Sequence, residues 1–238
     1  MENVNAYEMV QFSRGSYGDI LWRIERERLK LLIDEFRGSH AIVDYLDFAA
    51  GTGRIISFVE NLVDTAVGIE ISEAMTKRAS HSVKSARIIS CDITAPCTPL
   101  EGKYDFITAF RFLLNAEPSL RLAALKALAA RLRDDSSWLV FNNHGYTLSY
   151  RLLAYPFYKI RSLGKEILKA NYLTHREVFQ IADEAGLRID RIFGYGVFSG
   201  KVVCMLPSDK AVRLEKFAAQ NTALSKLGAL QMYVARLK

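Results

Sequence analysis

The chain has 238 residues, half of them hydrophobic and 24% charged, with a formal net charge of +6. This length suits one large α/β domain with a sizeable core, and the mild basic excess permits acidic substrates, nucleic acid or a membrane surface without selecting one. Three cysteines without a C-x-x-C pair and four histidines without H-E-x-x-H argue against a disulfide scaffold, a zinc cluster or any dedicated metal site. Without a signal peptide or an apolar span, we expect a soluble cytoplasmic protein with no membrane span.

The predicted elements begin with an amphipathic helix over residues 17–37, which ends at Gly38. Strands and helices then alternate. Strands are predicted at 41–48, 65–71, 86–91, 104–110, 137–143 and 187–198, and helices at 54–62, 72–83, 118–132 and from Thr174 onward. This alternation predicts a parallel sheet with helices on both faces, whose ligands bind beyond the carboxyl ends of the strands.

The first predicted strand runs into a glycine-rich turn, residues 47–53, which reads DFAAGTG. Its glycines let backbone N–H groups approach a ligand closely, at a helix N-terminus that favours negative charge. A dinucleotide fingerprint needs a third small residue for close helix–strand packing. Ile56 stands at that position, where we expect its branched side chain to hold the helix away from the strand, and this argues against NAD. No G-K-[ST] occurs, which excludes a P-loop.

Carboxylates follow at the ends of the next two strands. Glu70 can accept hydrogen bonds from the two vicinal hydroxyls of a ribose, and Asp92 can accept one from an adenine amino group, with Ile93 over the ring face. Each has a simpler interpretation: a solvated residue at a strand end for Glu70, and a turn closed by its own side chain for Asp92. Together with the glycine turn, they favour an adenosyl ligand.

With these residues, the segment 40–200 resembles the class I S-adenosylmethionine-dependent methyltransferases. The resemblance depends on the glycine turn, on Glu70 with residues 71–75 behind it, on 91–93, on the 104–107 strand and on the order of the elements. The family's first glycine is Ala49 here. The resemblance implies a Rossmann-like, seven-stranded, mostly parallel sheet with helices on both faces, an antiparallel C-terminal strand at 231–238 and helical lid insertions.

The resemblance also implies S-adenosyl-L-methionine as the cofactor and S-adenosyl-L-homocysteine as its product. The cofactor-binding residues it implies are Tyr17, Asp47, Ala49, Gly51, Gly53, Glu70, Ile71, Met75, Asp92, Ile93 and Phe110. Among these, Tyr17 is placed to close a lid over the cofactor. We expect residues 1–238 to form a single domain, with an N-terminal helical lid over 1–38 and inserted segments over 146–173 and 199–230.

Two residues beyond the fourth and fifth strands are candidates for catalysis. Histidine is the side chain whose ordinary pKa lies nearest neutrality, so His144 is the best candidate for a general base; the alternative is a structural histidine that caps the strand. Arg111 can hold an anionic or hydroxylated acceptor; the alternative is an ion pair with Asp92 or Glu117.

We therefore expect a methyltransferase for a small or medium acceptor, such as a sugar or polysaccharide precursor or a secondary-metabolite-like compound. Basic and aromatic residues in 146–173 form either an acceptor lid that favours an anionic acceptor or an amphipathic helix and loop that cover the sheet. Nucleic acid is disfavoured because no RNA-binding motif accompanies them. A methyltransferase acting on RNA or protein, a non-catalytic cofactor-binding regulator and an NAD(P)-dependent reductase stay open as alternatives. So does a homodimer. The 199–230 insertion is a lid, a dimer surface or an interfacial helix, or it packs into the core.

Overall fold

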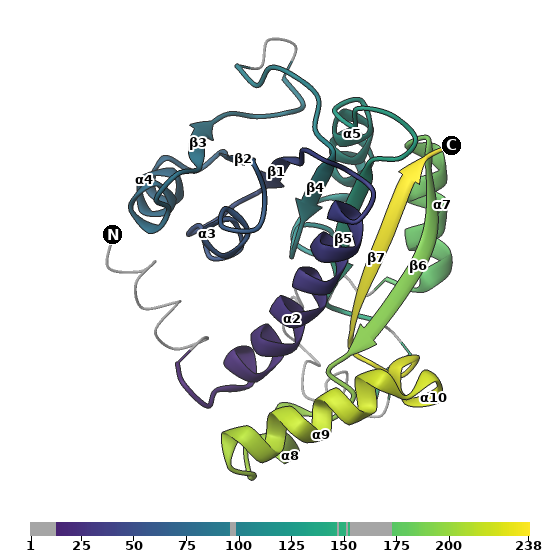
Figure 1. Ribbon diagram of the computed structural model, residues 1–238. Helices are drawn as coiled ribbons and strands as arrows, with labels where there is room; N and C mark the ends of the chain where they lie inside the picture. The colour runs from purple at the N-terminus through teal and green to yellow at the C-terminus, as the bar shows by residue number, and fades with distance from the viewer. Residues whose placement is uncertain (1–12, 96–98, 147, 151, 153–172) are drawn as a thin grey trace, which may run out of the picture.

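A computed structural model describes residues 13–95, 99–146, 148–150, 152 and 173–238. These residues build one sheet with helices on both of its faces (Figure 1). The helices are α2 (Tyr17–Arg37), α3 (Ile56–Val59), α4 (Glu73–Ser82), α5 (Pro118–Ala129), α7 (His175–Glu184), α8 (Gly200–Val203), α9 (Ser208–Gln220) and α10 (Thr222–Ser225). The strands are β1 (Asp44–Phe48), β2 (Thr65–Glu70), β3 (Arg87–Ser90), β4 (Phe106–Ala109), β5 (Trp138–Asn143), β6 (Leu187–Tyr195) and β7 (Leu230–Leu237).

The seven strands lie in the order β3-β2-β1-β4-β5-β7-β6. Strands β1 to β5 pair in parallel, and β7 is inserted antiparallel between β5 and β6. The predicted fold class, including the antiparallel C-terminal strand, is confirmed. The chain order reverses between β1 and β4, and a sheet of this kind opens a crevice at that point, beyond the carboxyl ends of the two strands.

Alternate residues of each strand supply two separate cores. Along β1, Tyr45 packs in the core on one face together with residues of α2 and α3. Its neighbour Leu46 packs in the core on the other face together with residues of α5 and α7. Both side chains are fully buried, as expected for a strand that is covered on both sides. Helix α4 flanks the sheet beside β2 and β3.

Helix α2 has the bounds that the sequence predicts. The side chain of Ser16 accepts a hydrogen bond from the Asp19 N–H at its start, and the backbone N–H of Gly38 closes its last turn. Its buried face contains Leu21, Leu29 and, between them at helical spacing, Glu25. None of the helices in the described ranges is both long and apolar enough to cross a bilayer.

The helix after the glycine turn is shorter than the predicted 54–62. Only Ile56–Val59 is α-helical, and the chain then turns at Glu60. The buried carboxylate of Glu60 accepts hydrogen bonds from the backbone N–H groups of Lys84, Ser85 and Ala86, in the segment that leads into β3. These charge-assisted bonds hold Glu60 at the sheet edge and hold the pKa of its carboxyl below the usual range, although burial opposes this.

Candidate active site

The glycine turn follows β1 directly and has three residues in the left-handed region: Ala49 (φ 55°), Gly51 (φ 59°) and Gly53 (φ 85°). Gly53 is required on steric grounds as well, because a Cβ there would lie 3.0 Å from the Cα of Ala79 in α4. At Gly51, by contrast, a Cβ would meet only the Ala49 carbonyl oxygen, at 3.9 Å. The turn is therefore packed against protein at Gly53 and open at Gly51.

Ile56 stands where a dinucleotide-binding turn has its third small residue, and it packs more closely against the sheet than we expected. Ile56 is fully buried, and a Cβ built on Gly68 of β2 would lie 2.9 Å from its Cδ1. The strand thus provides the glycine that makes room for Ile56. The expectation that the branched side chain holds helix and strand apart is wrong, because the small residue needed for close packing stands on the partner element.

Glu70 ties the turn to the next helix. Its Oε2 accepts a hydrogen bond from the Gly51 N–H at 2.9 Å, and its Oε1 accepts one from the Ser72 N–H at 3.0 Å. A carboxylate offers about four lone-pair positions. Two positions therefore remain for hydroxyl donors after the protein has used the other two.

Asp92 and Ile93 follow β3, at the next strand end. Asp92 is exposed, and its Oδ1 accepts hydrogen bonds from the N–H of Thr94 at 2.8 Å and from its hydroxyl at 2.7 Å. These bonds lower the pKa of the Asp92 carboxyl. Ile93 packs into the core beside α5. Ile71, after Glu70, is exposed to solvent.

Asp47 lies beneath the turn and is almost completely buried. Its Oδ1 accepts a hydrogen bond from the hydroxyl of Thr108 at 2.7 Å, and Thr108 is also bonded to the hydroxyl of Tyr45. Its Oδ2 has no hydrogen-bond partner among the described residues. Burial raises the pKa of Asp47 to about 7, although Thr108 and Tyr45 oppose the shift.

A cavity of about 300 Å³ lies against the turn. Among the described residues, its lining is Ala49, Ala50, Gly51, Thr52, Arg54, Ile55, Met75, Phe110, Arg111, Phe112 and Asn115. Five of them, Ala49, Gly51, Met75, Phe110 and Arg111, are predicted site residues. The other lining residues were not predicted, although Arg54 and Ile55 directly continue the turn and Phe112 directly follows Arg111.

Arg111 stands where β4 ends and is held in a strained backbone conformation, with φ at 59°. Its N–H donates to Oδ1 of Asn142 at 2.6 Å, and its carbonyl accepts from Nδ2 of Asn115 at 2.7 Å. A non-glycine residue in this region costs about 1–2 kcal/mol and persists only where its surroundings enforce it. The hydrogen bonds between the Arg111 backbone and the side chains of Asn142 and Asn115 hold this conformation. They therefore fix the position of the Arg111 Cα, from which the side chain extends.

The guanidinium of Arg111 faces a fully buried carboxylate. Its Nη2 lies 3.9 Å from Oε2 of Glu25, which comes from the inner face of α2. The other oxygen of Glu25 accepts hydrogen bonds from Nδ2 of Asn142 at 2.8 Å and from the hydroxyl of Tyr195 at 2.5 Å. Helix α2 and strands β5 and β6 thus support one cavity-lining side chain. The predicted alternatives, Asp92 and Glu117, are not the partners that the structure records.

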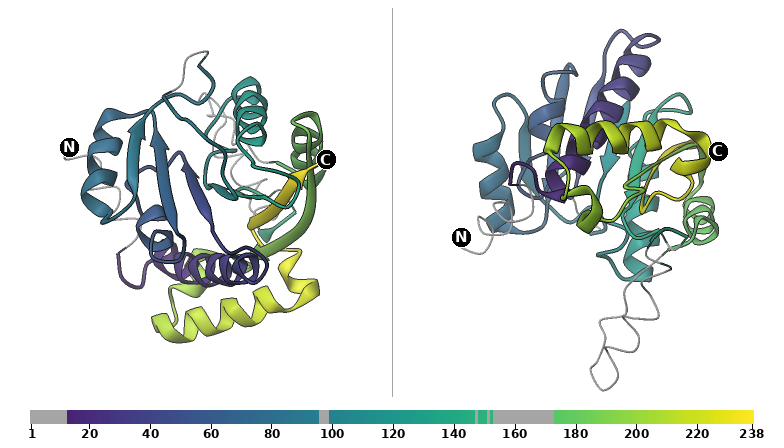
Figure 2. Two further views of the ribbon diagram at one scale, coloured as in Figure 1. Left: turned by 45° about the horizontal axis from the view of Figure 1, so that its top comes forward. Right: turned by 90° about the horizontal axis from the view of Figure 1, so that it is seen from below.

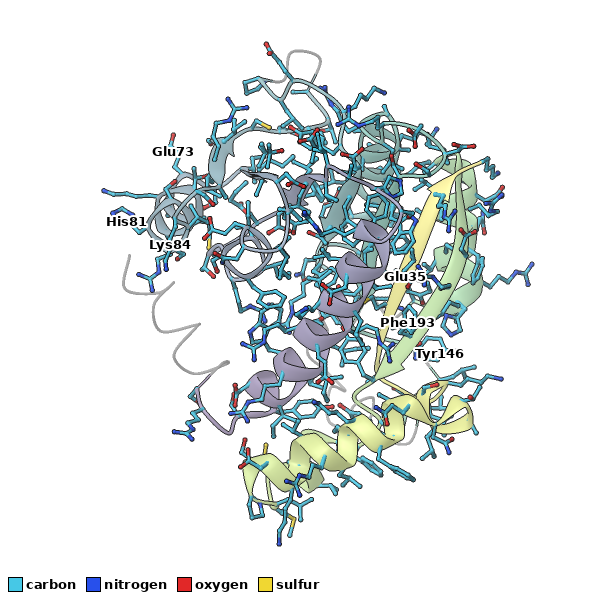
Figure 3. All side chains as sticks on the ribbon, in the orientation of Figure 1. Glu35, Glu73, His81, Lys84, Tyr146 and Phe193 are labelled. Atoms are coloured by element: carbon cyan, nitrogen blue, oxygen red, sulfur yellow. The ribbon has the colours of Figure 1, made fainter. Side chains whose placement is uncertain are left out.

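Tyr17 and His144 lie outside the described lining of the cavity. The hydroxyl of Tyr17 donates to the carbonyl of Phe198 at 2.8 Å, which ties the start of α2 to the segment that precedes α8. His144 directly follows β5 and is half-buried. In Figure 3 the side chains can be followed on the ribbon, and the labelled Glu73 and His81 mark α4, the helix that contributes Met75 to the cavity.

The residues present fit an adenosyl cofactor. Gly51 leaves open space beside its backbone, Glu70 keeps acceptor positions for a pair of hydroxyls, and Asp47 has a buried oxygen that no described residue satisfies. The cavity volume is at the lower end of the range for small-molecule sites. As for a metal, the described residues contain no cluster of three or more His, Cys, Asp or Glu side chains that could hold one.

Comparison with known proteins agrees with this geometry. The family model described as a methyltransferase domain matches residues 21–192. An S-adenosylmethionine-dependent methyltransferase from Clostridium acetobutylicum has a TM-score of 0.63 at 14% identity, over 99% of this chain and 98% of that chain. Magnesium protoporphyrin IX methyltransferase from Synechocystis, solved with bound S-adenosylhomocysteine, has a TM-score of 0.59 at 14% identity, over 90% and 83%.

A third structure, a methyltransferase from Methanosarcina mazei, has a TM-score of 0.58 at 14% identity, over 84% of this chain and 93% of that chain. Likeness at these identities shows the shared fold. No curated protein sequence matches the chain. The family model covers most of the chain, and the sheet order, the glycine turn and Glu70 stand where the resemblance implies. The chain belongs to the class I S-adenosylmethionine-dependent methyltransferases.

Proposed function

We propose that the protein methylates a small or medium-sized acceptor that carries an anionic or hydroxylated group, such as a sugar or polysaccharide precursor. The observation that supports this most is the cavity, because the glycine turn and the Arg111 segment line the same space. When bound, S-adenosylmethionine supplies a methyl group activated on a sulfonium. The protein has to bind this donor, orient the acceptor and exclude water. One of the structural relatives acts, by its name, on a small molecule, magnesium protoporphyrin IX.

The donor is bound, in this proposal, by residues at three strand ends. The backbone from Ala49 to Gly53 holds its amino-acid part over the buried Asp47, and Glu70 accepts from the ribose hydroxyls. The carboxylate of Asp92 accepts a hydrogen bond from the amino group of the adenine. Met75 and Phe110, which line the cavity, provide apolar surface on either side. Ile71, Ile93 and Tyr17 complete the donor site, with Tyr17 closing the N-terminal lid over the donor.

The acceptor is oriented by Arg111. Its guanidinium presents planar donors that match a carboxylate, a phosphate or a pair of hydroxyls. A side chain that begins from a constrained backbone and faces Glu25 gives up little conformational entropy on binding, so its geometry is defined before the acceptor arrives. Phe112 and Asn115 add apolar and polar surface beside it.

His144 is proposed as the general base for an oxygen acceptor. It follows β5 directly, two positions after Asn142, which bonds the Arg111 backbone. A hydroxyl acceptor has to lose its proton as the new bond forms, whereas a neutral amine does not require a base in the transition state. His144→Ala should therefore lower turnover far more than donor affinity if the acceptor atom is oxygen. Unchanged turnover would remove His144 from this role.

The proposal is tested by transfer of labelled methyl from S-adenosylmethionine to a small-metabolite extract and, separately, to total RNA and protein. We expect label in the small-metabolite fraction, and we expect Arg111→Lys, which keeps the charge but loses the planar fork, to raise KM for the acceptor about tenfold or more. Label confined to RNA or protein would overturn the assignment. Binding of the donor without transfer to any fraction would favour a non-catalytic regulator.

A further inference from the structure

Helices α8 and α9, with the turn between them, expose large apolar side chains. The exposed fraction is 83% for Met205, 65% for Phe217 and 52% for Val202. Single exposed apolar residues are ordinary on a protein surface, but a concentration of them in one segment marks an interaction site. Phe217 is the clearest case, because α9 has a well-defined buried side and Phe217 is not on it.

Basic side chains lie among these apolar residues. Lys201, Lys210 and Arg213 are exposed, and the structure records no ion pair between them and any described residue. Lys210, Arg213 and Phe217 are three and four residues apart along α9, so they share one face of the helix. We call the six residues Val202, Met205, Phe217, Lys201, Lys210 and Arg213 the α8–α9 face.

The α8–α9 face lies at the carboxyl edge of the parallel strands. Figures 1 and 2 show α8 and α9 beyond the ends of these strands, and α9 crosses the front when the molecule is seen from below. Helix α9 packs on α2 and β6 through Ala211, Val212 and Ala218, so its exposed side points away from the body of the protein. The cavity lies at the same edge, because Gly51 follows β1 and Arg111 follows β4.

Helix α9 is also joined to the site by its one buried carboxylate. Both oxygens of Glu215 accept backbone hydrogen bonds, from Val197 and from Phe198, at 3.0 Å each. Phe198 is the residue whose carbonyl receives the hydroxyl of Tyr17 at the start of α2. Whatever docks on the α8–α9 face is therefore connected by direct contacts to the helix that supports Arg111.

We propose that the α8–α9 face docks the enzyme on the surface of a bilayer that contains anionic lipids. The apolar side chains enter the boundary between headgroups and acyl chains, and the basic side chains remain at the level of the anionic headgroups. Each Lys or Arg near such a surface contributes about 1 kcal/mol, or about fivefold in partitioning. The docked protein presents its cavity edge to the membrane, where an acceptor carried by a lipid would be found.

Two other occupants fit the face less well. In a symmetric dimer through this face, the same patch would meet itself, and Lys210 and Arg213 of the two copies would repel one another. A nucleic acid would be attracted by the basic residues, and its bases stack on aromatic rings, but Phe217 is the one aromatic side chain of the α8–α9 face, and Val202 and Met205 gain no partner from phosphates or bases. A bilayer surface uses both kinds of side chain at once.

The experiment is co-sedimentation of the 238-residue chain with phosphatidylcholine vesicles that contain increasing fractions of phosphatidylglycerol. Binding should rise with the phosphatidylglycerol content and fall with salt. The double variant Lys210→Glu/Arg213→Glu should lower the partition coefficient by about a hundredfold or more, and Phe217→Ser should lower it by about tenfold.

Matched control variants lie away from the face. Lys84→Glu/Arg87→Glu makes the same change in net charge beside the amino end of β3, on the side of the molecule where Figure 3 labels Lys84. Ile42→Ser removes an apolar side chain that is 64% exposed, just before β1. Both should bind vesicles as the wild type does. Unchanged affinity for S-adenosylhomocysteine in every variant verifies that the site is folded.

Failure of the wild type to bind phosphatidylglycerol vesicles would overturn the proposal, as would equal losses in the control variants. A dimer seen by light scattering that Phe217→Ser dissociates, without vesicle binding, would identify a second copy of the chain as the occupant. Salt-sensitive RNA binding without vesicle binding would identify a nucleic acid. None of these outcomes bears on methyl transfer to a soluble acceptor, which tests the proposed function separately.

Discussion

Replacement of Glu25 tests whether the buried contacts around Arg111 build the site. Glu25→Ala removes the acceptor of hydrogen bonds from Asn142 and Tyr195 and the carboxylate 3.9 Å from Arg111. All of Glu25 is buried, as are Asn142 and Tyr195, so these two donors lose their acceptor without gaining water, whereas Arg111 lines the cavity and is partly exposed. Each buried donor left without an acceptor costs about 1–3 kcal/mol, so the two together cost about 2–5 kcal/mol. That is a large part of the 5–15 kcal/mol by which a typical domain is stable.

The Glu25→Gln variant removes the negative charge of the side chain while keeping its size and shape. The amide keeps one oxygen as an acceptor for Asn142 and Tyr195 but removes the negative charge opposite Arg111, so we expect a loss of about 1–2 kcal/mol. The acceptor KM should rise with little change in donor affinity, because Arg111 loses its positioning partner while the glycine turn and Glu70 are untouched.

Urea unfolding followed by circular dichroism gives the free energies, and Glu27→Ala is the matched control. Glu27 lies on the same helix but is exposed, and its ion pair with Lys216 is a surface pair, so its loss should cost no more than about 0.5–1 kcal/mol. If Glu25→Ala destabilised the protein no more than Glu27→Ala does, the reasoning about the buried contacts would be refuted.

Three further predictions concern the turn and the strand beneath it. Ala49→Gly should raise the free energy of unfolding by about 0.5–1 kcal/mol, since relief of a left-handed alanine exceeds the added chain entropy; a lower melting temperature would contradict this. Gly53→Ala should cost about 2–4 kcal/mol, because its Cβ would meet the Ala79 Cα at 3.0 Å, and thermal unfolding measures the loss. The carboxyl of Asp47 has a pKa of about 7 in the folded protein against 3.8 ordinarily, so the folded state binds its proton more tightly and loses stability as pH rises through 7. The loss amounts to about 3–4 kcal/mol between about pH 4 and pH 8, and Asp47→Asn should lack it when unfolding is measured across that range.

Much of the architecture is predictable because it follows from local patterns. The apolar spacing and the capping residues give α2 its bounds, and Thr174 starts α7 with its side chain bonded to the Glu177 N–H. The alternation of strands and helices leads to the parallel sheet, and the strand ends then indicate where the ligand binds. Glu70 could be placed at the end of β2, beside the glycine turn, because that position depends only on the topology.

What escaped prediction depends on residues far apart in the chain. In the sequence, Glu25 cannot be distinguished from the other charged residues of a helix rich in Arg, Glu and Lys. Its partners Asn142 and Tyr195 are 117 and 170 residues away along the chain. Its position between Leu21 and Leu29 on the apolar stripe was the available signal. Ile56 was misjudged for a similar reason, because the glycine that accommodates it, Gly68, belongs to another element.

The structure describes the second predicted insertion but little of the first. Residues 153–172, most of the first one, lie outside the described part of the chain, as do residues 1–12 of the N-terminal lid. In the second insertion, α9 buries only part of its apolar residues. Val212 is buried, whereas Phe217 is exposed, because the small side chains of Ala211 and Ala218 form the contact with the body of the protein instead. Small residues carry little hydrophobic signal in a sequence, although they permit the closest packing.

The central claim is that the cavity beside the glycine turn binds S-adenosylmethionine, and calorimetric titration tests it most directly. S-adenosylhomocysteine should bind the wild-type protein at a single site, Glu70→Ala should weaken that binding by about tenfold or more because the ribose loses its acceptor, and NADH should give no saturable heat. Binding of NADH without binding of S-adenosylhomocysteine would contradict the account.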